Sequence, residues 1–223
     1  MIIKSKKVFT PNATSELIVE SAIKHIKKKS DILDLGCGTG FIGLTIQKKI
    51  KFKNNYFFSD LSSKAIALCK KNAKKNKVKI VAKIGAIYKP WKTQKFDIIV
   101  ESVSGIAKDV AKISPWYKNK IPCDCGKDGT LLVSKVLKES KKHLNKNGKI
   151  FFPIVSLSNK NKILKSARKH FSKVKLLSSK DWPLPKSMYS SSKLLSKLKK
   201  AGIINFKTKY GLILYTTDIY IAY

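Results

Sequence analysis

The stretch of residues 31–43 constrains the fold of this chain more than any other part of its sequence. It reads Asp-Ile-Leu-Asp-Leu-Gly-Cys-Gly-Thr-Gly-Phe-Ile-Gly and begins as an apolar-rich strand with Asp34 near its end. Three glycines then occupy alternate positions, which are Gly36, Gly38 and Gly40. An apolar helical pattern starts at Phe41. The pattern predicts a strand, a tight glycine turn and a helix.

This unit has the features of a ligand-binding corner. Glycine permits positive φ angles and lets a ligand approach the backbone. A strand, a glycine-rich turn and a helix also direct backbone N–H groups and a helix N-terminus into one crevice. We therefore expect Asp34 and the loop from Gly36 to Gly40, Cys37 included, to contact a ligand. The alternative is a plain strand-to-helix turn.

Strands and helices alternate along the 223 residues. Strands are expected at 31–35, 55–60, 77–84, 96–100, 149–155, 173–177 and 212–222. Helices are expected at about 12–29, 41–49, 130–144, 161–171 and 193–200, with one more that begins at Ser62 or Ser63 and includes Ala73. Residues 182–185, Trp-Pro-Leu-Pro, are expected to be irregular. This order predicts one α/β domain, residues 1–223, with a helical segment at 1–30 and a Rossmann-like, doubly wound, seven-stranded, mostly parallel sheet.

Ligands in such sheets bind beyond the carboxyl ends of the strands. Asp60 closes the second strand, 26 residues after Asp34. A carboxylate there can accept two hydrogen bonds from a ribose diol, and Leu61 could pack on the adenine face. Ala86 and Glu101 follow the third and fourth strands. The alternative for Asp60 is a cap on the next helix.

The segment 101–128 lacks clear periodicity and contains Trp116 and Tyr117 among prolines and lysines. Connections of this length in compact domains are often functional lids. We expect this segment to fold over the ligand. If the ligand donates a chemical group, the segment is also expected to supply much of the specificity for the molecule that accepts it. A mobile, solvated loop is the alternative.

The net charge of +35 has two interpretations. One is a polyanionic partner, bound through phosphate contacts. The other is a solvated surface, because the lysines are spread over the whole chain and Arg168 is its one arginine. Weak nonspecific nucleic-acid binding is compatible with either.

Four cysteines show no metal-ligand spacing, which indicates reduced thiols. No metal site is expected. His25, His143 and His170 are expected on helix surfaces. No run is long and apolar enough for a membrane span, and the N-terminus lacks the apolar core of a signal peptide, so we expect a soluble, cytoplasmic protein.

The acid two residues before the first of three alternate glycines resembles motif I of class I S-adenosylmethionine (SAM) dependent methyltransferases. The likeness extends to release-factor glutamine methyltransferases over about residues 8–180. The segments that carry it are Phe9-Thr-Pro11 with Ser15-Glu16-Leu17, the run Ser59–Asn76, and Gly126-Lys-Asp-Gly129. The resemblance implies that SAM is the cofactor, with Asp34 and the glycine loop at its methionyl end and Asp60 at its ribose.

Two departures from that family concern the adenine and the acceptor. Ala86 stands where the family has an acid facing the adenine amine. Ser102-Val-Ser-Gly105 stands where the family has its catalytic Asn-Pro-Pro-Tyr, which holds a planar amide or amine nitrogen. Planar amide and amine acceptors are therefore disfavoured. Glu101 is the candidate general base, with Ser102 and Ser104 beside it, although Glu101 could equally be a strand-end cap.

Three functional hypotheses follow. The first is a SAM-dependent methyltransferase acting on an unidentified protein, RNA or small-molecule acceptor. The second is a SAM-binding module that has lost catalysis, because the family's acid at the position of Ala86 and its Asn-Pro-Pro-Tyr motif are both missing. The third is a methyltransferase directed at RNA or a ribosomal component, because of the net charge.

Overall fold

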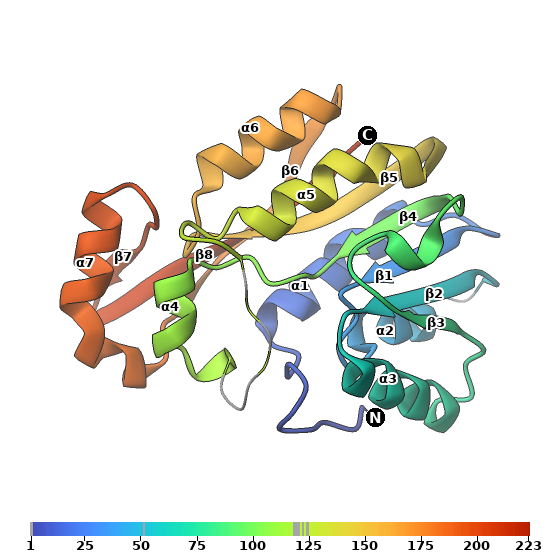
Figure 1. Ribbon diagram of the computed structural model, residues 1–223, viewed down its shortest axis with the longest axis horizontal. Helices are drawn as coiled ribbons and strands as arrows, with labels where there is room; N and C mark the ends of the chain where they lie inside the picture. The colour runs from blue at the N-terminus through green and yellow to red at the C-terminus, as the bar shows by residue number, and fades with distance from the viewer. Residues whose placement is uncertain (1, 51, 118–120, 122, 124) are drawn as a thin grey trace.

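The computed structural model describes residues 2–50, 52–117, 121, 123 and 125–223. Within these residues a single sheet has the strand order β3-β2-β1-β4-β5-β8-β6, and β7 pairs with β8 outside this path (Figure 1). The strands are β1 (Asp31–Leu35), β2 (Asn55–Asp60), β3 (Val81–Ile84), β4 (Phe96–Glu101), β5 (Leu144–Val155), β6 (Val174–Pro183), β7 (Lys207–Lys209) and β8 (Leu212–Ala222).

Five neighbouring strands of the sheet, from β3 to β5, are parallel. Strand β8 then runs antiparallel to both β5 and β6. The predicted α/β class and the mostly parallel, doubly wound sheet are confirmed. The path holds the seven expected strands, and β7 adds a hairpin at the end of the sheet.

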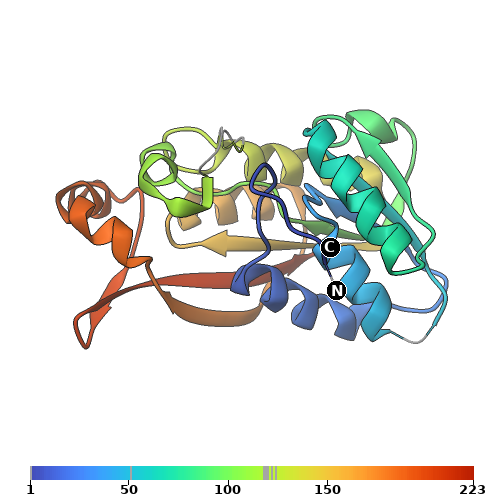
Figure 2. The same cartoon turned by 90° about the horizontal axis from the view of Figure 1, so that it is seen from below.

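Helices cover both faces of the sheet (Figure 2). They are α1 (Ala13–Ala22), α2 (Phe41–Lys49), α3 (Ser63–Lys75), α4 (Lys108–Ile113), α5 (Leu131–Ser140), α6 (Lys160–His170) and α7 (Ser192–Lys200), with short 3₁₀ turns η1 (Ile23–His25), η2 (Lys89–Trp91), η3 (Pro115–Tyr117), η4 (Lys141–His143) and η5 (Lys186–Ser191). Helices α1, α2 and α3 pack on one face, and α5 and α6 pack on the other.

The central strands are apolar on both faces because both faces are covered. In β1, Ile32 joins the cluster under α1 and α2, whereas Leu33 and Leu35 join the cluster under α5 and α6. In β4, Ile98 and Ile99 divide in the same way. This alternation with a period of two decides which side chains at the strand ends face which layer.

Several expected elements differ in extent. Helix α1 ends at Ala22 and continues as a 3₁₀ turn, and β3 is limited to its last four residues. Strand β6 runs through Trp182 and Pro183, which were expected to be irregular, because both pair with β8. The prediction of surface histidines is wrong for His143, which is buried and stacks on the ring of Tyr88 at 4.4 Å.

The segment after β4 is partly helical, since it contains α4 and η3. Its apolar side chains join a third hydrophobic cluster with η5, α7 and β8. We refer to the described part of residues 101–128 as the lid segment. The third cluster lies beyond the ends of the central strands and connects the lid segment to the last third of the chain. Among the described residues, no helix is long and apolar enough to cross a membrane.

Gly43 tests how tightly α2 packs on the sheet. A Cβ there would lie 2.5 Å from the ring of Phe58 and 3.3 Å from a carboxyl oxygen of Asp34. Glycine-to-alanine changes within helices ordinarily stabilise by about 1 kcal/mol. We expect Gly43→Ala instead to lower the free energy of unfolding by about 1–3 kcal/mol, because the packed core must shift.

Urea unfolding followed by circular dichroism measures this effect. Lys48→Ala on the same helix is the control, since Lys48 is exposed, and it should change stability by less than about 0.5 kcal/mol. A Gly43→Ala variant as stable as the parent would contradict the close packing of α2.

Candidate functional site

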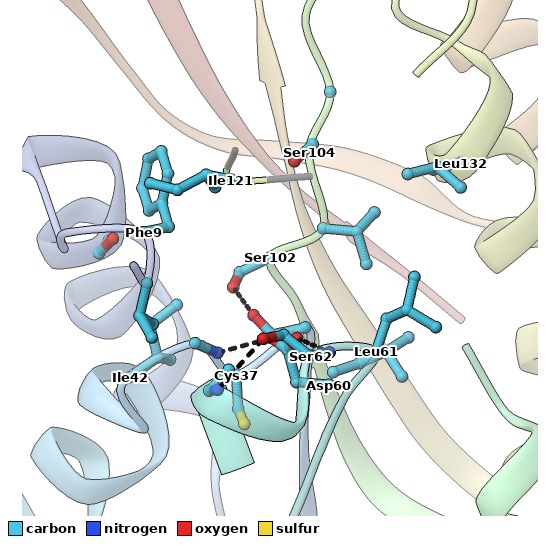
Figure 3. A pocket seen from close by; sticks show the side chains of 18 of the residues that line it. Phe9, Cys37, Ile42, Asp60, Leu61, Ser62, Ser102, Ser104, Ile121 and Leu132 are labelled. Carbon is cyan, nitrogen blue, oxygen red and sulfur yellow. Dashed lines mark hydrogen bonds between the residues drawn. The ribbon is translucent and has the colours of Figure 1, made fainter. Parts of the chain in front are cut away.

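A cavity of about 330 Å³ lies at the carboxyl ends of β1, β2 and β4 (Figure 3). Its described lining comes from the glycine loop, the ends of β2 and β4, the N-terminal segment, the lid segment and the strands β5 and β8. The lining residues include Lys7, Phe9, Gly36, Cys37, Gly38, Asp60, Leu61, Ala86, Ser102, Ser104, Trp116, Tyr117, Ile121, Lys135, Pro153, Val155 and Tyr215. Most of the predicted site residues are thus brought together.

The floor of the cavity is a set of hydrogen bonds between the end of β2 and the glycine loop. The carbonyl of Ser59 accepts from the amides of Gly36 at 2.8 Å and Cys37 at 3.0 Å. One carboxyl oxygen of Asp60 accepts from the amide of Gly38 at 2.9 Å, and the other accepts from Ser62 at 2.8 Å. The loop is therefore fixed by β2, and the half-buried Asp60 stands at the centre of the floor.

These bonds change the expected role of the loop. The sequence suggested that its N–H groups would be open to a ligand, yet the amides of Gly36, Cys37 and Gly38 already donate within the protein. The acceptor that the loop can offer instead is the carbonyl oxygen of Gly36. The carbonyl of Gly36 accepts one bond, from the Ser102 hydroxyl at 3.0 Å, and keeps a second lone pair. Such acceptors suit a cationic group, such as an ammonium.

Asp34 lies beneath the loop and is not among the described residues that line the cavity. It is buried, and one carboxyl oxygen accepts from the amide of Gly43 at 2.9 Å, while the other has no partner among the described residues. Burial raises its pKa to about 7, against the effect of the Gly43 hydrogen bond. Its observed contact positions the start of α2, and contact of Asp34 with a ligand, directly or through water, stays a prediction.

Glycine is required at Gly40 and suits Gly38 for different physical reasons. A Cβ at Gly40 would lie 2.7 Å from the sulfur of Cys69, so this position needs the missing side chain for packing. A Cβ at Gly38 would have no neighbour closer than 3.9 Å. Gly38 also lines the cavity, so its open side leaves room for a ligand against the backbone. The thiol of Cys37 turns inward to Cys69, which leaves its backbone for the cavity.

Leu61 and Ala86 line the cavity where the chain leaves β2 and β3. The Leu61 side chain is 64% exposed, which is unusual for leucine and makes it available to cover a flat ligand group. Ala86 follows Gly85, whose amide donates to the carbonyl of Asp60 at 3.0 Å. Both residues line the cavity, and their contact with an adenine stays a prediction.

Ser102 and Ser104 both line the cavity, as predicted. The hydroxyl of Ser102 is turned toward the glycine loop by its bond to Gly36. Ser104 contacts the hydroxyl of Tyr117, whose pKa is raised by burial. Val103 packs against Gly36, where an added Cβ would lie 3.0 Å from its side chain. The end of β4 therefore closes tightly on the loop.

Glu101 occupies a different layer. Its carboxyl is buried on the face of β4 opposite to Val100, toward Tyr88, and it is not among the described residues that line the cavity. One oxygen accepts from the amide of Val103 at 2.8 Å, and the other has no described partner. Burial raises its pKa to about 8. The predicted role as a base in contact with the acceptor is therefore not supported by this position.

Aromatic side chains wall the other half of the cavity. Phe9 and Tyr117 lie with ring centroids 5.6 Å apart, and Trp116 contacts Tyr215 at 5.5 Å. The sequence offered Trp116, Tyr117, Trp182 and Tyr189 as possible walls of a pocket, and the first two line the cavity whereas the last two are not among its described lining residues. Phe9 and Tyr215 were not predicted as site residues. These two come from opposite ends of the chain, and the only local signal was that Phe9 precedes Pro11 in the segment before the first helix.

Comparisons with known proteins agree with this geometry. Residues 4–102 match the methyltransferase small domain family. The release factor glutamine methyltransferase of Borreliella burgdorferi is 34% identical over 152 residues, which cover 66% of this chain and 52% of that protein. The chain therefore spans about half the length of this relative.

Solved structures share the fold at low sequence identity. The precorrin-6y C5,15-methyltransferase of Geobacter metallireducens GS-15 has a TM-score of 0.62 and 10% identity, and the match covers 100% of this chain and 93% of that one. The 16S rRNA N2 G1207 methyltransferase of T. thermophilus, in complex with AdoMet and guanosine, has a TM-score of 0.60 and 15% identity, covering 96% and 44%.

The fold is that of the class I methyltransferases. Within it, residues 4–102 match the methyltransferase small domain family, and the curated relatives of the chain include the release factor glutamine methyltransferases that the sequence resembled.

The two buried acids predict an unusual dependence of stability on pH. The pKa values of Asp34, at about 7, and Glu101, at about 8, lie above those of exposed carboxyl groups. The folded state therefore holds two protons that the unfolded state releases from about pH 4 upward. Each group is expected to lower the free energy of unfolding as pH rises, by up to about 1.4 kcal/mol per pH unit, until pH passes its folded pKa.

Urea unfolding between pH 5 and pH 9 measures this dependence. Glu101→Gln keeps the shape without the titration, so its stability should fall less steeply over this range than that of the parent. Glu139→Gln serves as the control and should leave the slope unchanged, since Glu139 lies outside these buried positions. Equal slopes for Glu101→Gln and the parent would show that Glu101 is not buried as a neutral acid.

Proposed function

We propose that this chain is a SAM-dependent methyltransferase that binds SAM across the ends of β1 and β2. The observation that carries the proposal is the floor of the cavity, where Asp60 is held by the amides of Gly38 and Ser62. Since each carboxyl oxygen has a second lone pair, Asp60 can still accept from a ribose diol. The match of residues 4–102 to a methyltransferase family supports the same conclusion.

The residues present fit the shape and charge of SAM. Leu61 offers an exposed apolar surface for the adenine, and the carbonyl of Gly36 offers an acceptor for the ammonium. The open side of Gly38 leaves room for the methionyl part. When bound, SAM supplies a reactive sulfonium methyl group, so that positioning of the acceptor carries much of the remaining catalysis.

The acceptor that we propose is neutral and is not a planar amide or exocyclic amine. The relative from Borreliella burgdorferi is named a release factor glutamine methyltransferase. In this chain Ser102 donates its hydroxyl to Gly36, which leaves no pair of aligned side-chain acceptors for an amide nitrogen. The aromatic walls of Phe9, Trp116 and Tyr215 suit a flat ring or an apolar group.

A second candidate is a SAM-binding module without catalysis. It is favoured by the position of Glu101, which faces away from the cavity, so that among the described lining residues Asp60 is the only carboxylate. This candidate shares the donor site with the first and differs from it in turnover alone.

Calorimetry with SAM and S-adenosylhomocysteine tests the donor site. We expect Asp60→Ala to weaken SAM binding by about 1–3 kcal/mol, because charged hydrogen bonds to the ribose are lost. Asp109→Ala is the matched control, since its carboxylate is paired with Lys112 outside the cavity, and it should leave the affinity unchanged. No binding of SAM to the folded parent at millimolar concentration would overturn the proposal.

Transfer of labelled methyl groups from SAM into cell extract tests catalysis and the lid. We expect Ser102→Ala and Trp116→Ala each to lower turnover at least about ten-fold, and Trp116→Ala to change SAM affinity less than about three-fold, since Trp116 belongs to the aromatic wall whereas Ser102 also holds the Gly36 carbonyl. Lys112→Ala, exposed on α4, is the control. Labelled product from the parent excludes the inactive module, and full activity of both variants would contradict the assigned role of the lid.

A further inference from the structure

The last third of the chain forms a lobe that extends beyond the aromatic half of the cavity. We define the terminal lobe as residues 186–212, which comprise η5, α7, β7 and the turn into β8. In Figure 1 and Figure 2 it stands at the end of the molecule opposite to α3. The terminal lobe contains seven lysines and no aspartate or glutamate. Its surface is therefore cationic along its whole length.

One face of α7 forms a shallow groove of hydroxyl and ammonium groups. The residues that line it are Ser192, Lys193, Ser196, Lys197 and Lys200, all of them exposed. Among the described residues, no carboxylate lies within salt-bridge distance of these lysines. Lysine and serine donors without competing acids suit phosphate oxygens spaced along a chain.

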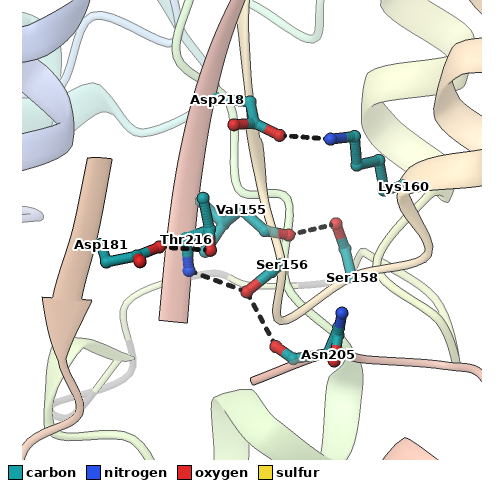
Figure 4. Close-up of polar contacts among 8 residues, drawn as sticks. All are labelled: Val155, Ser156, Ser158, Lys160, Asp181, Asn205, Thr216 and Asp218. Carbon is teal, nitrogen blue, oxygen red and sulfur yellow. Dashed lines mark hydrogen bonds and ion pairs between the residues drawn. The ribbon is translucent and has the colours of Figure 1, made fainter. Parts of the chain in front are cut away.

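The terminal lobe is fixed to the sheet, so this groove has a defined position. The hydroxyl of Ser156 donates to the carbonyl of Asn205 at 2.8 Å and accepts from the amide of Thr216 at 2.9 Å (Figure 4). The hydroxyl of Thr216 donates to Asp181 at 2.7 Å, and Asp181 also pairs with Lys207. The carboxylate of Asp181 is thus already paired with Lys207 and Thr216, at the point where the lobe joins the sheet.

The lobe and the acceptor half of the cavity share one hydrophobic cluster. Leu195 and Leu198 of α7 pack in the cluster that includes Tyr215 and is joined by Trp116. Tyr215 and Trp116 also line the cavity and contact each other. Leu195 and Leu198 thus hold α7 on the same hydrophobic cluster that supports the aromatic wall of the cavity.

The hairpin tip adds an exposed aromatic ring to the cationic surface. Tyr210 is 88% exposed, and the ammonium of Lys209 lies 5.1 Å from the centre of its ring. An exposed ring among lysines has the chemistry of a platform on which a nucleobase stacks while the lysines contact the phosphates.

We propose that the terminal lobe binds a single-stranded RNA segment. RNA supplies the repeated phosphates for the α7 groove and a planar ring for Tyr210. Single-stranded RNA fits because an unpaired base is free to stack on an exposed ring, whereas the bases of a duplex are already stacked and paired. This inference rests on the proposed methyltransferase function.

Fluorescence anisotropy with a short labelled single-stranded RNA tests the proposal. The test variant is Lys193→Glu, Lys197→Glu, Lys200→Glu in one chain. The matched control is Lys70→Glu, Lys71→Glu, Lys74→Glu on the exposed face of α3, which changes the net charge equally at the other end of the molecule. We expect the α7 variant to bind at least about ten-fold more weakly and to lower the slope of log affinity against log salt by about 2.

Tyr210 provides a second, independent measurement. We expect Tyr210→Ala to weaken RNA binding about five-fold or more through loss of stacking, whereas Tyr210→Phe should retain it. A single-stranded DNA of the same sequence, heparin and anionic lipid vesicles serve as competitors. RNA should be bound more tightly than each of them.

The outcomes separate this inference from the proposed function. Equal losses in the α7 and α3 variants, or equal binding of RNA and heparin, would overturn the lobe as an RNA site while SAM binding by calorimetry remains intact. Preference for DNA or for vesicles would overturn it in the same way. Loss of SAM binding in the parent would instead overturn the methyltransferase proposal, whatever the RNA result.

Discussion

The cavity depends on one set of hydrogen bonds, those that the end of β2 makes to the glycine loop. The Ser59 carbonyl and the Asp60 carboxylate accept from three successive amides of the loop, at Gly36, Cys37 and Gly38. Three consecutive donors that would cost free energy if buried without partners are thereby satisfied by one strand end. Because those donors are satisfied internally, the polar group that the loop retains for a ligand is the carbonyl oxygen of Gly36. The register between β1 and β2, which places Leu35 beside Ser59, therefore sets both the shape and the polarity of the donor site.

The sequence predicted the parts of the fold that are locally encoded. The bounds of β1, α2, β2 and β8 agree with the expected ranges, because each is marked by an apolar pattern with polar or glycine residues at its ends. The length of β6 could not be predicted in this way. Trp182 and Pro183 read locally as a break, yet they pair with Tyr215 and Leu214 of β8, more than thirty residues later in the chain. Pairing between distant segments decides such cases, and no local pattern reports it.

The candidate site also contains residues that the local sequence could place and residues that only the tertiary fold brings together. Asp60 and the two serines could be placed from the order of strands, since ligands bind at the carboxyl ends of a parallel sheet. Glu101 lies at the predicted strand end, but the order of the strands alone did not indicate which face of β4 it occupies. The alternation in β4 holds the information, because Ile99 and Glu101 share one face and Val100 lies on the other. Phe9 and Tyr215 meet only through the tertiary fold, so their part in the aromatic wall needed the structure.

The buried acids and the exposed lysines together explain how the charge of the chain relates to its stability. Of 13 acids, Asp34 and Glu101 are buried with raised pKa values, so they neutralise little of the surface charge. The four ion pairs among the described residues leave most of the lysines without a carboxylate. Mutual repulsion between them opposes the compact state and is screened by salt over about 10 Å at 0.1 M ionic strength. A polyanion that binds the folded chain relieves this repulsion and stabilises the fold by mass action. A polyanion gains most binding free energy on a lysine surface without acids, such as that of the terminal lobe. The positive charge that lowers the stability of the free fold therefore also favours the complex with a polyanion.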